Sequence, residues 1–172
     1  ALKDESEYAR RAAVEVLNEV GNENSVKDLL DAIKDDDWWV SERAVDALGE
    51  IGDVEALPRL QEMLNGQPKS IPSVVKALGK LGNTAVVPQL ITLMQRSEPN
   101  IITEAITALS LLIHDTNVNE VRAIIQPMMQ VDNENIAMAA TDAMERITNR
   151  YSDSMIANHE KAQHLAEPEH TM

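Results

Sequence analysis

Apolar residues recur along this chain with two nested periods. On the short scale they are three or four residues apart, which is the spacing of one face of an α-helix. One such stripe comprises Val40, Ala44, Ala47, Leu48 and Ile51. On the long scale a leucine column recurs every 30 or 31 residues, at Leu17, Leu48, Leu78 and Leu109. A fixed period of this length indicates a solenoid, because one unit cannot bury its apolar face alone.

A turn signal follows the leucine in each of the first three units. Four residues later comes a glycine with a short polar residue: Gly21-Asn22, Gly52-Asp53 and Gly82-Asn83. The glycine predicts the end of a helix, with Gly52 in the left-handed conformation. A second apolar run follows each glycine. Pro58 and Pro88 share a register in these runs, and proline is tolerated in the first turn of a helix. The second helices should therefore begin near Ala56 and near Ala85 or Val86.

The pattern predicts an all-α solenoid of four to five helix pairs. The expected helices are 4–20, 25–34, 38–51, 56–65, 71–81, 86–96, 100–113, 118–130 and 134–149. The fourth unit is irregular, because Ile113-His114-Asp115 replaces the glycine turn and Pro127 should kink or break the second helix.

The periodicity divides the chain into a repeat domain and a tail. Residues 1–150 form the repeat domain, and 151–172 form an acidic polar tail with at most one marginal helix at 155–166. Residues 153–172 should be dispensable for folding. The core must be aliphatic, since the chain has no Phe, and we expect Leu48, Leu78 and Leu109 to join neighbouring units.

The formal net charge of −14 narrows the classes of partner. It argues against nucleic acid, which requires a clustered basic face, and against an anionic membrane surface. A protein or peptide partner, including a basic one, remains open. The absence of cysteine fits a reducing compartment. Without an apolar run near 18 residues or a signal peptide, we expect a soluble, cytoplasmic monomer.

The first unit shows no polar capping modification, although solenoids need a polar cap at each end. We therefore expect the chain to be a fragment of a longer protein. The alternative is a short protein whose initiator methionine was removed.

Two segments carry a family resemblance. Residues 36–40 with 44–53, and residues 76–83, resemble the short HEAT-like repeat first named after phycobilisome lyases. The resemblance covers about 9–149 and implies HEAT-like helix pairs. The family usually has an arginine one residue after the position of Val40. That column here reads Arg10, Ser41, Ile71, Ile102 and Ala137, so the arginine-based turn contacts of the family are expected only in the first unit.

A narrower resemblance involves residues 13–18 and 36–40, which look like HEAT tails joined to some bacterial serine/threonine protein kinases. The chain has no glycine-rich phosphate loop, His-Arg-Asp or Asp-Phe-Gly motif. If the parent protein is a kinase, its catalytic domain lies outside these residues.

Candidate metal and catalytic residues are few. Asp35-Asp36-Asp37 could bind a hard cation, but an aspartate capping the helix that starts near Trp38 is the better interpretation. His159, His164 and His170 have poor spacing for a metal site, and His114 stands alone in a turn. No carboxylate pair or nucleophile motif is evident, so we expect no enzymatic activity and no cofactor in this chain.

The second helices should line a concave wall that binds a partner. Their alignment places one column, Leu30, Gln61, Ile91 and Ile125, one position past the buried Leu29, Leu60, Leu90 and Ile124. Met129 extends this column, and a polar rim comprises Arg59, Glu62, Gln89, Thr92, Arg122 and Gln126. The alternative is that these residues are covered by their own repeats.

Trp38 and Trp39 are adjacent and cannot both face the same core. One should pack against the preceding unit, and the other could be an exposed interface anchor. Alternatively, both fill the junction between units.

These observations favour a protein-interaction or scaffolding module, part of a larger protein that could be kinase-linked. The alternative is a lyase or chaperone-like component that handles a chromophore or cofactor. A tetrapyrrole would need basic anchors for its carboxylates, and the wall offers only Lys27, Lys34, Arg59 and Arg122. Incubation with bilin and absorbance spectroscopy would separate the two functions.

Overall fold

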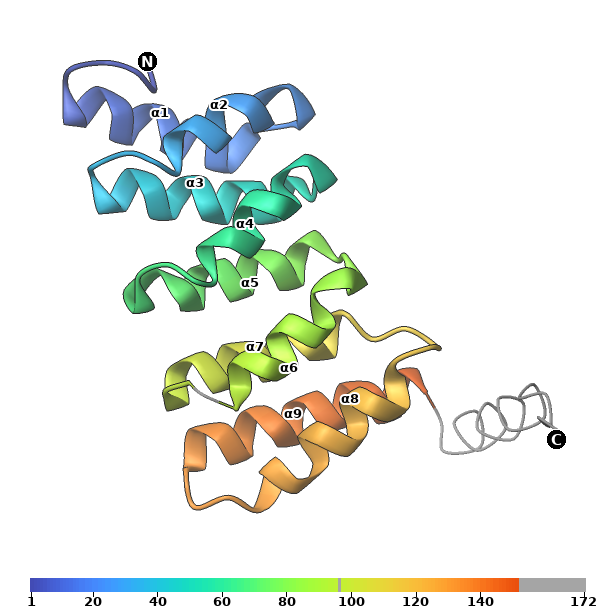
Figure 1. Ribbon diagram of the computed structural model, residues 1–172. Helices are drawn as coiled ribbons and strands as arrows, with labels where there is room; N and C mark the ends of the chain where they lie inside the picture. The colour runs from blue at the N-terminus through green and yellow to red at the C-terminus, as the bar shows by residue number, and fades with distance from the viewer. Residues whose placement is uncertain (96, 152–172) are drawn as a thin grey trace, which may run out of the picture.

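The helices form two layers that run from one end of the molecule to the other (Figure 1). The computed structural model describes residues 1–95 and 97–151. The longer helices stack in one layer: α1 (Glu7–Val20), α3 (Trp38–Ile51), α5 (Ile71–Leu81), α7 (Pro99–Leu111) and α9 (Glu134–Arg150). The shorter helices form the other layer: α2 (Val26–Ala32), α4 (Leu57–Met63), α6 (Val87–Met94) and α8 (Val118–Ile125). These ranges contain no strand, and the predicted all-α solenoid is confirmed: four helix pairs and the first helix of a fifth.

The predicted glycine turns hold the two helices of a pair together. Gly52 and Gly82 have φ values of 71° and 78°, the left-handed conformation that glycine adopts without a Cβ clash. The Gly52 N–H donates to the Leu48 carbonyl at 3.2 Å, which ends α3. The side chain of Asp53 then accepts from the Glu55 N–H at 2.8 Å. This bond starts a 3₁₀ turn (Val54–Ala56) that leads directly into α4.

Proline fixes where the second helices begin. Pro58 and Pro88 lie in the first turn of α4 and α6, where a missing N–H costs no helical hydrogen bond. The helices begin at Leu57, one residue after the predicted start, and at Val87, one or two residues after it, because 3₁₀ turns take up the preceding residues.

The fourth unit departs from the others as predicted. The α-helical part of its second helix ends at Ile125, and a 3₁₀ helix (Gln126–Gln130) follows around Pro127. Asn117 replaces the glycine in the preceding turn. Its side chain accepts from the His114 N–H at 2.7 Å and donates to the Leu112 carbonyl at 3.1 Å.

The core is aliphatic and continuous along the solenoid. Leu48, Leu78 and Leu109 are fully buried, which confirms them as core residues. Tyr151, which the sequence assigns to the tail, is also buried, with 8% of its surface exposed. The expected tail from 152 onward, with its histidines and possible helix, lies outside the described residues.

The two layers pack differently. Each long helix packs on the next long helix, and each short helix packs mainly on the long helix of the following unit, α2 on α3 and α4 on α5. Both layers therefore contribute to the contacts between units, but the short helices pack on long helices rather than on one another, which leaves grooves between them. No helix in ranges 1–95 and 97–151 is long and apolar enough to cross a membrane.

Candidate partner-binding surface

A groove lies between α4 and α6 on the layer of short helices. Its volume is about 370 Å³, and it is lined by Gln61, Leu64, Asn65, Pro88, Gln89, Thr92 and Leu93. Leu64 is buried and Leu93 is half-buried, whereas Asn65, Gln89 and Thr92 are exposed. The groove thus has apolar residues at its base and polar residues at its edge, as in the core and rim of a protein interface.

Two of the predicted contact residues meet across this groove. The Gln61 side-chain amide donates to the Gln89 Oε1 at 2.8 Å, joining α4 to α6. A glutamine side chain has two donors and an acceptor, so each amide retains capacity for a further hydrogen bond. The structure therefore brings Gln61 and Gln89 together at a surface that can bind polar groups.

The predicted column needs one correction. Leu30, Gln61 and Ile91 are half-buried, as expected for residues at the edge of the core. Ile125 is fully buried instead, and its neighbour Ile124 is half-buried. The prediction placed these two residues the wrong way round.

The longer turn of the fourth unit explains why Ile125 rather than Ile124 is buried. It moves the second helix on by one more residue than the alignment assumed, so that Ile125 continues the buried column Leu29, Leu60 and Leu90. Gln126 then takes the next position and is exposed. The surface column is therefore polar in the second and fourth units.

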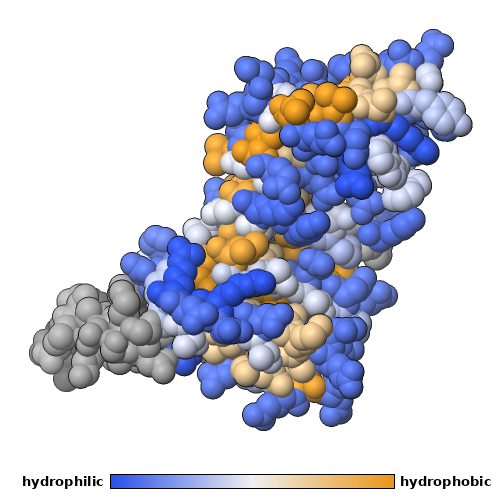
Figure 2. Space-filling view, turned by 180° about the vertical axis from the view of Figure 1, so that it is seen from behind, coloured by the Kyte–Doolittle hydropathy of each residue, from blue (hydrophilic) through white to orange (hydrophobic). Residues whose placement is uncertain are grey.

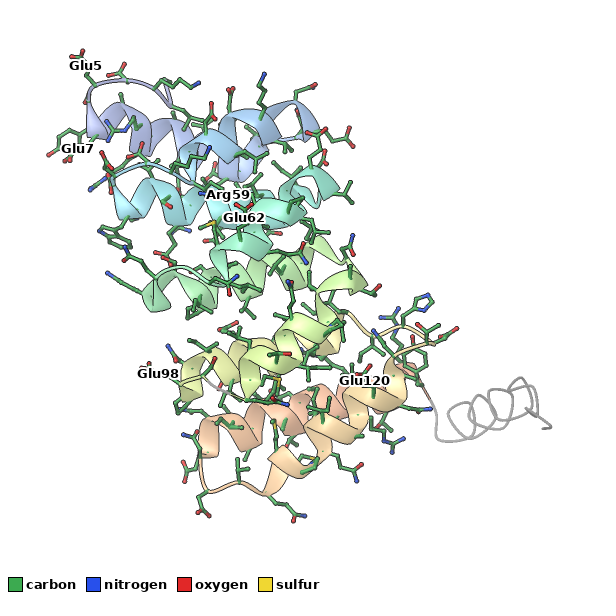
Figure 3. All side chains as sticks on the ribbon, viewed as in Figure 1. Glu5, Glu7, Arg59, Glu62, Glu98 and Glu120 are labelled. Atoms are coloured by element: carbon green, nitrogen blue, oxygen red, sulfur yellow. The ribbon has the colours of Figure 1, made fainter. Side chains whose placement is uncertain are left out.

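The other predicted rim residues lie outside the groove. Arg59 forms an ion pair with Glu62 at 2.7 Å within α4, and Figure 3 shows the two side by side. Arg122 is half-buried on α8 and interacts with neighbouring groups, and Met129 is exposed in the 3₁₀ helix after α8. Neither α8 nor the 3₁₀ helix after it contributes to the lining of the α4–α6 groove, so Arg122 and Met129 do not belong to this site.

The adjacent tryptophans point to different surroundings, which confirms that part of the prediction. Trp39 is half-buried and packs on the core, with the Arg43 guanidinium 5.4 Å from its ring centroid. Trp38 is 57% exposed, and the Lys69 ammonium lies 4.9 Å from its ring centroid. Such a cation–π contact is favourable but weak at an exposed site. Trp38 is the exposed member of the pair.

Trp38 lines a second cleft of about 290 Å³. Asp36, Glu42 and Lys69 are among its charged lining residues, and Met63 lies at its apolar side. Met63 lines this cleft and the next residue, Leu64, lines the α4–α6 groove, so the end of α4 contributes to both hollows. Sequence reasoning missed Glu42 of α3 and Lys69 of the 3₁₀ turn (Pro68–Ser70), because the repeat period does not show which residues of neighbouring units meet across a cleft.

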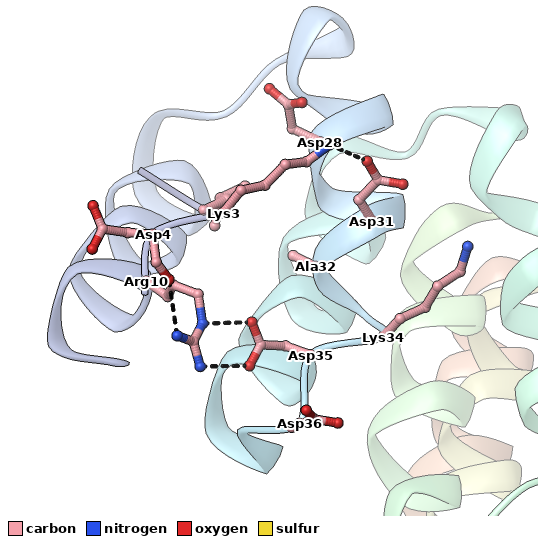
Figure 4. Close-up of a pocket in the computed structure, with 10 residues that line it drawn as sticks. Lys3, Asp4, Arg10, Asp28, Asp31, Ala32, Lys34, Asp35 and Asp36 are labelled. Carbon is pink, nitrogen blue, oxygen red and sulfur yellow. Dashed lines mark hydrogen bonds and ion pairs between the residues drawn. The ribbon is translucent and has the colours of Figure 1, made fainter. Parts of the chain in front are cut away.

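The aspartate run is paired with α1 rather than free to hold a cation. Arg10 donates from Nε and Nη2 to the two oxygens of Asp35, at 2.8 and 3.1 Å (Figure 4). Arg11 binds Asp37 at 2.6 Å, and the hydrogen bond from this guanidinium lowers the pKa of the Asp37 carboxyl. Asp37 also accepts from the Trp39 N–H at 3.0 Å, which identifies it as the predicted cap of α3. Asp36 alone is exposed.

The turn contact expected from the family arginine is present at Arg10. In the second unit, Ser41 takes the same column and donates from its hydroxyl to the Ile33 carbonyl at 2.8 Å. Among the described residues, no three His, Asp or Glu side chains come close enough to hold a metal ion. His159, His164 and His170 lie outside those residues.

Two family models match adjacent parts of the chain. Residues 1–72 match the model of HEAT repeats, and residues 73–96 match the model of the PBS lyase HEAT-like repeat. The chain is a HEAT-like repeat protein. This agrees with the helix pairs, the glycine turns and the stacked layers described above.

A solved structure supports the same fold. The structure of the complex of CpcE and CpcF of phycocyanin lyase from Nostoc sp. PCC7120 contains a chain that is similar, with a TM-score of 0.69 and 20% sequence identity. The match covers 86% of this chain and 62% of that chain. This HEAT-like chain therefore spans less than two thirds of that protein's length. No curated protein sequence matches it.

Proposed function

We propose that this HEAT-like chain is a protein-binding scaffold whose partner lies in the α4–α6 groove and reaches the Trp38 cleft. The observation that carries the proposal is that the end of α4 lines both hollows, the cleft through Met63 and the groove through Leu64. One extended or helical segment of a partner could contact both. The cleft would then supply an aromatic anchor, and Trp is a residue type enriched at the energetic centre of interfaces.

The charge of the chain supports a basic partner. The net charge is −14, and Asp36 and Glu42 both line the Trp38 cleft. A lysine or arginine of the partner would replace Lys69 over the Trp38 ring and gain these two carboxylates. Binding of this kind weakens as salt rises, because exposed charges are screened over about 8–10 Å at physiological ionic strength.

The proposal can be tested without a known partner. Peptides selected from a random displayed library against the whole chain would be counter-screened against the double variant Gln89→Arg with Thr92→Arg. Both residues are exposed, so the variant should fold. The matched control is Thr84→Arg with Ala85→Arg, two exposed residues of the 3₁₀ turn (Thr84–Val86) that precedes the same helix.

We expect most selected peptides to lose about tenfold or more in affinity for the groove variant, equivalent to roughly 1.4 kcal/mol, and to retain affinity for the control. Trp38→Ala should weaken those peptides that carry lysine or arginine. Unchanged binding to the groove variant, with both variants folded by circular dichroism, would show that the groove is not the partner site.

A second candidate function is the handling of a linear tetrapyrrole. It is favoured by the match of residues 73–96 to the PBS lyase HEAT-like repeat and by the likeness to a phycocyanin lyase chain. The α4–α6 groove has no lysine or arginine among its lining residues, so it offers no cation for a propionate. Saturable binding of bilin, followed as a shift of its visible absorbance, would support this candidate. The absence of enzymatic activity, the link to a kinase and the cytoplasmic location stay predictions.

A further inference from the structure

The second unit carries an aromatic–acidic pair that the other units lack at the same positions. Trp38 and Glu42 lie one helical turn apart on α3, a spacing that places both on one face of the helix. Aligned on the leucine column, the corresponding pairs are Glu7 with Arg11, Pro68 with Pro72, Pro99 with Thr103, and Glu134 with Met138. The repeat fold therefore does not require the pair, which distinguishes the Trp38 cleft from the other junctions between units.

The walls of the cleft come from two neighbouring units. The buried Val45 continues the α3 wall, and the other wall includes the 3₁₀ turn (Pro68–Ser70) and Ser73 of α5. The Ser73 hydroxyl donates to Glu42 Oε1 at 2.6 Å, which joins α5 to α3 and holds the carboxylate in place. The second oxygen, Oε2, receives no hydrogen bond from the residues that the structure describes, so it can accept one from a bound group.

Two of the three carboxylates that line the cleft are available to a partner. Arg10 takes both oxygens of Asp35, as Figure 4 shows. Asp36 is exposed, and neither Asp36 nor Glu42 forms an ion pair in the part of the chain that the structure describes. The cleft therefore offers two unpaired negative charges beside an exposed aromatic ring.

Two other carboxylates between neighbouring units are paired within the chain. Glu15 lies 3.6 Å from Arg43, and Glu50 is paired with Lys80. Figure 2 views the molecule from behind and shows hydrophilic side chains over most of that surface, with apolar ones in separate patches. The Trp38 cleft is different because an exposed aromatic ring and unpaired carboxylates occur together in one hollow.

A lysine of the same chain shows what an ammonium gains in this cleft. The Lys69 ammonium lies 4.9 Å from the centroid of the Trp38 ring. It forms no ion pair with a carboxylate of the described residues, although Asp36 and Glu42 line the same cleft. An ammonium is a compact point charge on a flexible stem. Over this ring it gains the aromatic face and neither carboxylate.

The adjacent tryptophan shows what an arginine gains from the same kind of ring. The Arg43 guanidinium lies 5.4 Å from the centroid of the Trp39 ring. Its Nη1 atom is also 3.5 Å from Asp46, and its Nε atom is 3.6 Å from Glu15. A guanidinium is planar, so its face covers the ring while the N–H groups at its edge point to acceptors. One arginine thus gains a ring and two carboxylates together.

We propose that the Trp38 cleft binds the guanidinium of a partner arginine in preference to the ammonium of a lysine. The guanidinium displaces Lys69, stacks on the Trp38 ring and donates from its edge to Asp36 and Glu42, as in the arginine–tryptophan pair of the same helix. The half-buried Met63 lies beside the alkyl part of the arginine. This inference rests on the proposed function, because it names the partner group that enters the cleft.

The two tryptophans of the chain give the experiment an internal control. N-acetyl-arginine amide and N-acetyl-lysine amide are each titrated into the isotopically labelled whole chain at equal ionic strength, and NMR follows both indole N–H signals. We expect the arginine compound to shift the Trp38 signal saturably and to bind at least about threefold more tightly than the lysine compound. The Trp39 signal should stay in place, because its ring is half-buried and already faces Arg43.

Two variants test the groups that receive the guanidinium. Glu42→Gln keeps an acceptor for the Ser73 hydroxyl but removes the charge, so arginine binding should weaken by about threefold or more. Its matched control is Glu55→Gln, at an exposed residue of the 3₁₀ turn before α4 that does not line the cleft. Lys69→Ala removes the internal competitor and should strengthen arginine binding. Lys76→Ala removes an exposed lysine of α5 outside the cleft and should change arginine binding little.

Four results would overturn the proposal. The first is equal affinity for the arginine and lysine compounds, and the second is unchanged arginine binding by Glu42→Gln. The third is a Trp38 signal that the arginine compound does not shift, in either the parent chain or Lys69→Ala, at the highest soluble concentration. The fourth is tighter binding of free arginine than of its acetyl amide, because the ligand would then be the amino acid rather than a protein side chain.

This inference and the proposed function fail in different experiments. The arginine compound is small enough to contact the cleft alone, so a negative titration refutes the arginine site whatever the selected peptides do. Peptides that bind the groove variant as well as the parent chain refute the partner path through the α4–α6 groove, even where the arginine compound shifts the Trp38 signal.

Discussion

Gly49 of α3 packs directly against Ala77 of α5. A β-carbon on Gly49 would lie 2.7 Å from the Cα atom of Ala77 and 2.9 Å from its Cβ atom, closer than side chains normally approach. The same relationship recurs one unit later between Gly79 and Ala108. The spacing between α3 and α5 and between α5 and α7 is therefore set by a glycine–alanine contact at each of these two interfaces.

This contact predicts the effect of adding a single methyl group. Gly49→Ala should reduce the free energy of unfolding by about 1–3 kcal/mol, because the backbones of α3 and α5 must move apart. Helix propensity acts in the opposite direction, since alanine is favoured over glycine by roughly 1 kcal/mol in a helix. Urea unfolding followed by circular dichroism measures the difference.

Lys76→Ala is a suitable control for Gly49→Ala. Lys76 is exposed on α5, so its replacement should change the unfolding free energy by less than about 0.5 kcal/mol. If Gly49→Ala proves more stable than the parent chain, the two helices are not in close contact at this point.

The buried leucine column predicts a cavity effect. Leu78→Ala should cost about 2–5 kcal/mol of unfolding free energy, since Leu78 is fully buried between neighbouring units. Leu111→Ala makes the same change at a residue of α7 that is 48% exposed, and a much smaller loss is expected there. Equal losses in the two variants would contradict the assigned helix register.

The capping aspartate predicts a loss of stability in acid. The hydrogen bond from Arg11 lowers the pKa of Asp37 in the folded chain below the value of about 3.9 expected when unfolded. The contribution of this carboxylate is therefore present above the unfolded pKa and is lost as the pH falls through the lower, folded pKa. Thermal unfolding midpoints of the parent chain and Asp37→Asn, measured from pH 7 down to pH 2, should converge below about pH 4.

Asp36→Asn is the control for this pH series. Asp36 is exposed and forms no ion pair in the part of the chain that the structure describes, so this variant should follow the parent chain at every pH. A difference between Asp37→Asn and the parent that stays constant down to pH 2 would show that the Arg11–Asp37 pair does not contribute.

The regular units could be predicted from sequence because their signals are local. A glycine four residues after the leucine, then Asp53 or Asn83, specifies the end of one helix and the cap of the next turn. Pro58 and Pro88 then fix the start of the second helix. Each of these residues acts on its own backbone or on that of a near neighbour, so no knowledge of packing is needed.

The candidate site was predicted less well, for two physical reasons. In the fourth unit, adjacent isoleucines at 124 and 125 leave the register open, and only packing decides that Ile125 turns inward. The Trp38 cleft depends on the loop that carries Lys69, whose place beside α3 is a tertiary contact.

The last prediction concerns the C-terminal boundary of the fold. The sequence ends the repeat domain at Arg150, whereas the structure buries Tyr151 and joins its N–H to the Ile147 carbonyl at 2.8 Å. Burial also raises the pKa of the Tyr151 hydroxyl. Truncation after Tyr151 should therefore leave the melting temperature close to that of the whole chain, because residues 152–172 continue no repeat pattern in the sequence.

Truncation after Arg150 removes one more residue and should lower the unfolding free energy by about 1.5–3 kcal/mol, the scale of burying one large side chain. Tyr151→Phe in the whole chain separates packing from the hydroxyl: it should stay near the parent value at neutral pH, because the ring remains buried. Differential scanning calorimetry of the whole chain, the two truncated chains and Tyr151→Phe decides whether the fold ends at Arg150 or at Tyr151. If truncation after Tyr151 already lowers the melting temperature as much as truncation after Arg150, the segment from 152 onward stabilises the fold, and the prediction that it is dispensable is wrong.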